Sequence, residues 1–236
     1  MTPTTSTVGE ETPHSARGPT VVVLHGFAGR RFMNLPLARM LRLAGYRPVD
    51  LSYASWRLSL SEICDQLAPR LARADEESDI GSLHVVAHSM GGLVARALIH
   101  HCRPKSLGRV VMLGTPNGGS EIADVLQRQI LLRQVLGKAA PALLTRRPAA
   151  IEAMLGTVNY PLGIVAGSRP VMPIGALRLV PVPSDGKVSV ASTRLAEATD
   201  HIVLPLPHAL LPYHSSAHRQ IRHFLRHGHF QHQGEV

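Results

Sequence analysis

The chain has 236 residues, of which 44% are hydrophobic and 17% are charged, and its formal net charge is +9. This length suits one α/β domain with a sizeable core, and the low charged fraction excludes a mostly disordered chain. Aromatic residues make up only 4%, which argues against a stacking platform for nucleic acid. The basic residues are scattered, so we predict no nucleic-acid partner and keep contact with an anionic membrane as a separate hypothesis.

The first residues differ in composition from the rest of the chain. They are rich in Thr, Ser, Pro and Gly, and we predict a disordered leader over residues 1–19. They lack the features of a secretory signal, and no apolar run reaches the roughly 18 residues of a membrane span, so we expect a cytoplasmic protein. Cys64 and Cys102 lie in apolar helical patterns, which favours free thiols over a disulfide.

From residue 20 onward, runs with strand character alternate with runs with helical character. The strand-like runs are short and apolar, as expected of strands buried on both faces, and they cover 20–24, 47–51, 82–87, 109–113, 163–166 and 201–204. The helical runs cover 35–44, 59–74, 90–101 and 215–226. Ser59 and Glu62 form a capping box at the start of the second. This alternation predicts one α/β domain over 20–236, with a mostly parallel central sheet flanked by helices.

The stretch VVAHSMGGLVAR, residues 85–96, passes from a strand to a helix within about two residues. Such a junction forces Ser89 into strained backbone geometry and requires small residues two positions away, which Ala87 and Gly91 provide. The hydroxyl would then lie beyond the carboxyl end of a central strand, at the positive end of the next helix. The alternative is that Ser89 only caps this helix.

These residues form a nucleophile elbow, and the sequence resembles the α/β-hydrolase superfamily, in particular bacterial lipases and esterases with AHSMGG. Ala87 departs from the common G-x-S-x-G pattern, which has Gly at this position. Two further segments carry the resemblance: HGFAG at 25–29 and LGTPNGGS at 113–120. Asn117 stands where many lipases have His, and we interpret it as a residue that orders its loop.

The resemblance implies an oxyanion hole made by the backbone N–H groups of Phe27 and Met90. These groups would bind the charge that develops when Ser89 attacks an ester carbonyl. The resemblance places four further residues in the loops of the site: His25, Gly26, His88 and Gly91. The alternative for the first loop is that its glycines only shape a turn.

In this superfamily the acid and the base follow the serine in that order. Asp185, in PSDGKVSV, matches the position of the acid, although it could also belong to an ordinary Asp-Gly turn. Asp200 is the alternative acid. His208, in LPLPHALL, follows the last strand and is the candidate base. Because the chain has 14 histidines, three others compete with it: His201, His214 and His218.

A cluster of histidines near the C-terminus raises the question of a metal site; it comprises His223, His227, His229 and His232. No Cys or acidic residue accompanies this cluster in the sequence, so we interpret it as a solvated tail and predict no metal. The acyl-enzyme cycle that the resemblance implies needs no metal and no organic cofactor.

Residues 120–160 have helical spacing and little strand character. In this superfamily an insertion here often covers the serine, so we expect a helical cap or lid; the alternative is a helix packed into the main core. An apolar cap would favour acyl chains. We therefore predict a serine hydrolase of carboxylic esters, with lipid or acyl esters as substrates. The alternatives are an acyltransferase or thioesterase on the same fold, or a non-catalytic binding protein that keeps the hydrolase shell.

Overall fold

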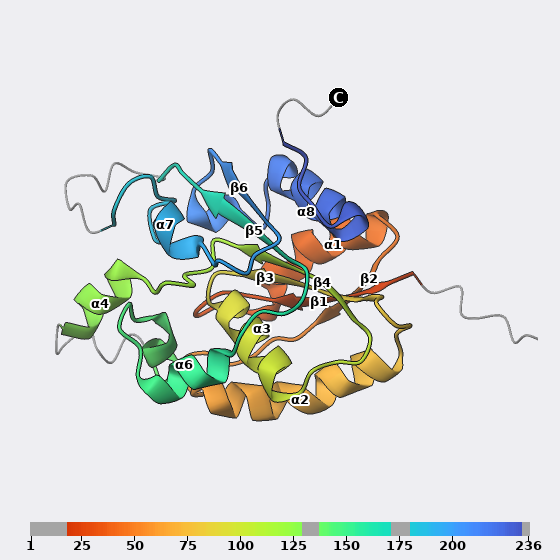
Figure 1. Ribbon diagram of the computed structural model, residues 1–236, viewed down its shortest axis with the longest axis horizontal. Coiled ribbons are helices and arrows are strands. Elements are labelled where there is room, and N and C mark those ends of the chain that lie inside the picture. The colour runs from red at the N-terminus through yellow and green to blue at the C-terminus, as the bar shows by residue number, and fades with distance from the viewer. Residues whose placement is uncertain (1–17, 129–136, 171–179, 233–236) are drawn as a thin grey trace, which may run out of the picture.

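The computed structural model describes residues 18–128, 137–170 and 180–232, and its centre is one twisted sheet (Figure 1). Within these residues the sheet has six strands in the order β2-β1-β3-β4-β5-β6. Neighbouring strands in it are all parallel. The strands are β1 (Thr20–Leu24), β2 (Arg47–Asp50), β3 (Leu83–His88), β4 (Leu107–Leu113), β5 (Leu162–Gly167) and β6 (Asp200–Leu204). The predicted parallel sheet is thus confirmed.

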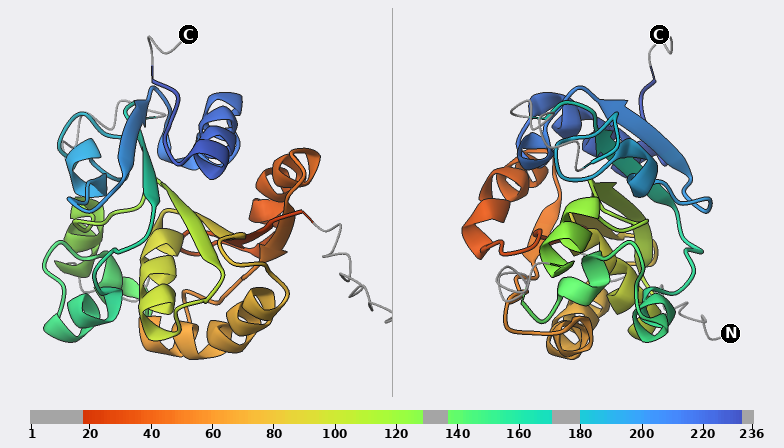
Figure 2. Two further views of the ribbon diagram at one scale, coloured as in Figure 1. Left: turned by 45° about the vertical axis from the view of Figure 1, so that its right-hand side comes forward. Right: turned by 90° about the vertical axis from the view of Figure 1, so that its left-hand side faces the viewer.

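Helices cover both faces of the sheet (Figures 1 and 2). The face at the top of Figure 1 carries α1 (Leu35–Leu43) and α8 (Ser215–His227). The opposite face carries α2 (Leu60–Glu76) and α3 (Met90–His101). The capping box of Ser59 and Glu62 is present at the start of α2. No helix among the described residues is both long and apolar enough to cross a membrane.

Shorter helices lie in the connections between strands. Those between β4 and β5 are α4 (Glu121–Arg128), η3 (Ala140–Leu143) and α6 (Ala149–Leu155). The connections after β1, β5 and β6 contain η1 (Arg31–Asn34), α7 (Val190–Thr193) and η5 (His208–Leu210). The helical character predicted for 120–160 holds in α4, η3 and α6, whereas residues 144–148 and 156–160 are not helical. Residues 129–136 of that segment, and residues 1–17 of the predicted leader, lie outside the described residues.

The core is divided in two by the sheet. In β1, Val21 and Val23 pack toward α1 and α8, whereas Val22 and Leu24 pack toward α2 and α3. All four side chains are at most 1% exposed. Because successive side chains of a strand point to opposite faces, a strand covered on both sides must be apolar at every position. This requirement explains the consecutive apolar residues of the central strands β1, β4 and β5. The edge strands β2 and β6 are only partly buried and contain charged residues.

His84, in β3, gives the stability of the fold a dependence on pH. Its ring is buried, and Nδ1 accepts a hydrogen bond from the backbone N–H of Arg109 at 2.9 Å. Burial lowers the pKa of His84 from 6.5 to about 4, and the charge of Arg109 adds to this effect. Below the pKa of the unfolded chain, the unfolded state therefore binds a proton that the folded state does not. From this residue we expect the free energy of unfolding to fall by about 2 kcal/mol between pH 7.5 and pH 5.

Denaturant unfolding at several pH values measures this dependence. In His84→Gln the amide oxygen can still accept the Arg109 N–H, but the side chain no longer titrates. The difference in unfolding free energy between the two pH values should therefore shrink in this variant. An unchanged difference would assign the pH dependence to other groups.

Candidate active site

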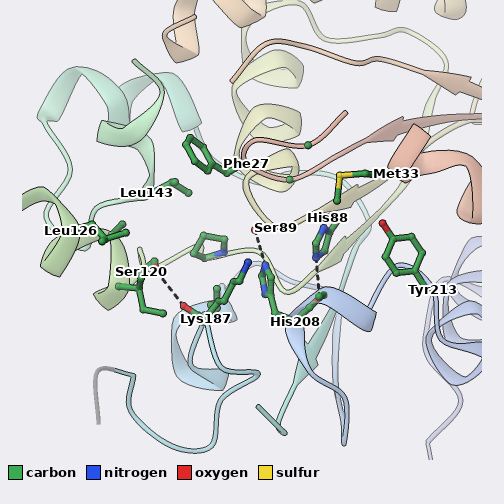
Figure 3. Close-up of a pocket in the computed structure, with 17 residues that line it drawn as sticks. Phe27, Met33, His88, Ser89, Ser120, Leu126, Leu143, Lys187, His208 and Tyr213 are labelled. Atoms are coloured by element: carbon green, nitrogen blue, oxygen red, sulfur yellow. Dashed lines mark hydrogen bonds between the residues drawn. The ribbon is translucent and has the colours of Figure 1, made fainter. Parts of the chain in front are cut away.

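Ser89 joins β3 to α3 in a strained backbone conformation, with φ 54° and ψ −126°. A residue with a side chain rarely adopts a positive φ, and such strain persists only where the surroundings enforce it. The Ser89 side chain makes no capping hydrogen bond to α3. The interpretation of Ser89 as a simple helix cap is therefore wrong, and its hydroxyl is free to face the edge of the sheet (Figure 3).

Close backbone contacts explain the small residues around Ser89. A Cβ at Gly91 would lie 2.6 Å from the carbonyl oxygen of His25, and a Cβ at Gly26 would lie 3.0 Å from the Cβ of Ser89. Ala87 is fully buried in β3, so the fold accommodates its methyl group where the common pattern has Gly. The loop after β1 thus lies directly against the elbow, as an oxyanion hole between these two segments requires.

Three side chains that are distant in the sequence meet at this edge of the sheet. His208 Nε2 lies 2.9 Å from Ser89 Oγ (Figure 3). His208 Nδ1 lies 2.7 Å from Asp185 Oδ2. Since a carboxylate can only accept, Nδ1 carries the hydrogen, and Nε2 is left to accept the proton of the Ser89 hydroxyl. A nucleophile, a base and an orienting acid in hydrogen-bond contact can support covalent acyl transfer.

Asp185 is buried, and both of its carboxylate oxygens are engaged. Oδ1 accepts the backbone N–H groups of Lys187 at 2.9 Å and Val188 at 2.8 Å, which leaves Oδ2 for His208. The Asp185 carbonyl also accepts the backbone N–H of His208 at 3.0 Å. Gly186 has φ 95°, a left-handed conformation that suits glycine. The Asp-Gly turn considered as an alternative is therefore present, and it aims the carboxylate at His208.

The residues that compete with the proposed acid and base have other partners. Asp200 accepts the backbone N–H of Phe230 at 2.7 Å and lies 3.0 Å from the ring of His232. The competing histidines also have other contacts. His201 contacts the Thr193 hydroxyl at 3.0 Å, and His214 caps α8 by accepting the backbone N–H of Ser216. His218 contacts the Pro212 carbonyl at 2.8 Å. The structure thus brings Asp185 and His208, rather than these residues, to Ser89.

The C-terminal histidines do not form a free tail. Phe230 is fully buried between them, and Asp200 binds both its backbone N–H and the His232 ring. The histidines are largely solvated, as predicted, because His227, His229 and His232 are exposed. The expectation that no acidic residue accompanies them is wrong, because Asp200, 32 residues earlier in the sequence, contacts His232. Among the residues that the structure describes, no cluster of His, Cys, Asp or Glu has the arrangement of a metal site.

His88 and His25 hold the loops around the site. His88 Nε2 donates to the His208 carbonyl at 3.1 Å, and burial lowers the pKa of His88 well below its usual value, so its ring stays neutral. His25 Nδ1 donates to the Gly26 carbonyl at 2.8 Å, and its ring stacks on Tyr53 with centroids 4.4 Å apart. Both histidines thus position loops that carry other residues of the site.

The sequence pattern did not identify Tyr53 and Ser55, which fix the loop after β1. The Tyr53 hydroxyl donates to the His25 carbonyl at 2.5 Å. Ser55 Oγ accepts the backbone N–H of Ala28 at 2.9 Å, and Ala28 has a positive φ of 53°. Both residues follow β2, the parallel neighbour of β1. Because parallel strands end at the same edge of the sheet, the polar residues directly after β2 could have indicated that this segment lies beside the site.

Asn117 orders the loop after β4, as predicted. It is buried, and Nδ2 donates to the carbonyl of Thr193 at 2.8 Å. The Arg147 guanidinium donates to the carbonyls of Asn117 at 2.8 Å and Pro116 at 2.7 Å. These bonds tie segment 137–160 to the loop that carries LGTPNGGS.

A cavity of about 420 Å³ opens onto Ser89 and His208 (Figure 3). Most of its wall is apolar, and the apolar side chains come from the loop after β1, from α4, from η3 and from the turn after Asp185: Phe27, Met33, Ile122, Ala123, Leu126, Leu143 and Val188. This volume is within the range of small-ligand sites. Part of segment 120–160 therefore lines the candidate site.

Sequence comparison places the chain in a family. A family model described as a domain of unknown function, DUF7379, matches residues 3–168. The chain belongs to the DUF7379 family. No curated protein matches this DUF7379 chain.

Solved structures of lipases and esterases share the fold of this DUF7379 chain. The mature Bacillus licheniformis lipase BlEst2 has a TM-score of 0.71 and 19% identity over 92% of this chain and 94% of its own. The metagenomic carboxyl esterase MGS0156 has a TM-score of 0.58 and 14% identity over 82% and 65%. Est1E from Butyrivibrio proteoclasticus has a TM-score of 0.58 and 14% identity over 91% and 90%. With the parallel sheet, these likenesses establish the α/β-hydrolase fold.

Proposed function

We propose that this protein is a serine hydrolase that cleaves carboxylic esters through an acyl-enzyme on Ser89. The observation that carries the proposal is the hydrogen-bonded chain from Ser89 through His208 to the buried Asp185, at 2.9 Å and 2.7 Å. In the first step His208 Nε2 takes the proton of Ser89 while Oγ attacks the ester carbonyl. Asp185 stabilises the imidazolium that forms, and the imidazolium then protonates the departing alcohol.

The oxyanion of each tetrahedral intermediate would be bound by the backbone N–H groups of Phe27 and Met90. One such donor contributes about 3–4 kcal/mol to lowering the barrier. In the second half of the cycle, His208 deprotonates a water molecule, which attacks the acyl-enzyme. When the bond between the acyl carbon and Oγ breaks, the imidazolium returns the proton to Oγ, and the acid and free Ser89 are released. The cycle uses no cofactor.

The apolar cavity supports acyl esters as the substrate class. Leu126 of α4 and Leu143 of η3 face it, so that an acyl chain bound there would be removed from water. Next to Met33, which also lines the cavity, Phe32 and Leu35 are exposed. Exposed apolar side chains near the entrance, on a chain of net charge +9, support contact with an anionic lipid surface.

The test is a series of p-nitrophenyl esters from C2 to C16, together with a fluorophosphonate probe. We expect covalent labelling of Ser89 and ester hydrolysis, with higher kcat/KM on medium or long acyl chains, and faster turnover when long esters are presented in anionic vesicles. If acyl transfer to an added alcohol or thiol outruns hydrolysis, the protein is an acyltransferase. If the probe does not react at all, it is a non-catalytic binding protein.

A further inference from the structure

We propose that Lys187 makes the site selective for esters that carry an anionic group, a carboxylate or a phosphate, on the acyl part. This inference rests on the proposed ester hydrolysis and adds a substrate class to it. Lys187 lines the same cavity as Ser89 and His208. Figure 3 shows its side chain directed into this cavity.

The backbone of Lys187 is held by the site itself. Its N–H donates to Asp185 Oδ1 at 2.9 Å, and its carbonyl accepts the Ser120 hydroxyl at 3.2 Å. The turn that aims the carboxylate of Asp185 at His208 therefore also fixes the direction in which the Lys187 side chain leaves the chain. The ammonium group is therefore carried at the wall of the cavity, on a flexible stem that can follow the charged end of a bound substrate.

The ammonium group has no counter-ion within the described part of the chain. None of the described residues that line the cavity is Asp or Glu, and no ion pair of Lys187 occurs among the described residues. The two internal segments outside the described residues, 129–136 and 171–179, contain no acidic residue in the sequence. Asp185, the nearest carboxylate along the chain, is already bonded to His208.

An unpaired cation in a mostly apolar cavity favours a substrate that brings its own negative charge. The apolar walls strengthen this attraction because they lower the local dielectric constant. Lys187 is itself exposed, so water screens part of this attraction. We therefore expect a preference of about tenfold rather than an absolute requirement.

Matched esters test the inference. p-Nitrophenyl hydrogen adipate and p-nitrophenyl methyl adipate differ only at the far end of the acyl chain, where the first has a carboxylate and the second a neutral methyl ester. A phosphonate-terminated ester of equal length distinguishes phosphate from carboxylate. The quantity measured is the ratio of kcat/KM for the anionic ester to kcat/KM for the neutral ester. In Lys187→Met this ratio should fall about tenfold, whereas Lys187→Arg, which keeps the charge, should retain it.

Lys138→Met is the matched control, because Lys138 pairs with Glu62 at the surface and does not line the cavity. This variant should leave the ratio unchanged. The inference is overturned if the ratio in Lys187→Met equals that of the wild type, or if both esters lose activity equally. Either result leaves ester hydrolysis intact, whereas a wild-type chain that neither hydrolyses the neutral ester nor reacts with a fluorophosphonate would overturn the proposed function itself.

Discussion

Ser89→Ala should lower kcat/KM for every ester by at least about 10⁴-fold and abolish labelling by a fluorophosphonate. The substitution removes the attacking oxygen and leaves the Phe27 and Met90 N–H groups in place, so only weak catalysis by the oxyanion hole can remain. The fold should be preserved, because within the described part of the chain the lost hydroxyl bonds only to His208 and does not cap a helix. Circular dichroism and denaturant unfolding check the fold, and initial rates check the activity.

Ser120→Ala is the matched control for this prediction. Ser120 lines the same cavity, but its Oγ donates to the Lys187 carbonyl at 3.2 Å and has no imidazole beside it. The Ser120→Ala chain should still be labelled by the probe. Labelling that persists in Ser89→Ala and disappears in Ser120→Ala would identify Ser120 as the nucleophile and remove the basis of the proposed mechanism.

The sheet and the elbow could be predicted because their signals are local. Runs such as TVVVL satisfy a requirement that holds within five residues, that both faces of a buried strand be apolar. The elbow is equally local. Ser89 is the single residue between β3 and α3, and a side chain at position 91 would collide with the carbonyl of His25. The expected strand and helix limits accordingly differ from the observed ones by no more than about two residues.

Contacts between distant segments were beyond a single sequence. The order of residues could propose Asp185 or Asp200 as the acid, but only the fold shows that the C-terminal segment occupies Asp200. The same limit explains why the contact between Asp200 and His232 was not foreseen and why Tyr53 was missed. For Lys187 the turn was visible in the sequence, but the hydrogen bond that its carbonyl accepts from Ser120, 67 residues away, was not.

Asp185→Asn should lower kcat/KM by about 10⁴-fold at neutral pH, although the two side chains have the same shape. The reason lies in the bonds of Oδ1, which accepts the N–H groups of Lys187 and Val188. The amide of Asn has one oxygen and one NH₂ group. The oxygen must stay with these two donors, because an NH₂ group in its place could not accept their hydrogen bonds. The NH₂ group is therefore forced toward His208 Nδ1, which must then accept a hydrogen bond instead of donating one.

This reversal moves the imidazole hydrogen to Nε2, the atom that faces Ser89 at 2.9 Å. A protonated Nε2 of a neutral ring cannot take the serine proton, so the nucleophile is not activated even though every heavy atom keeps its place. Nitrogen NMR of the His208 ring reports the tautomer directly and should show the hydrogen on Nδ1 in the wild type and on Nε2 in Asp185→Asn. Asp200→Asn is the control: it loosens the Phe230 segment and lowers stability, but it should keep the wild-type tautomer and kcat. An Asp185→Asn chain within tenfold of wild-type kcat/KM would mean that the 2.7 Å contact between Asp185 and His208 does not set the proton on the ring.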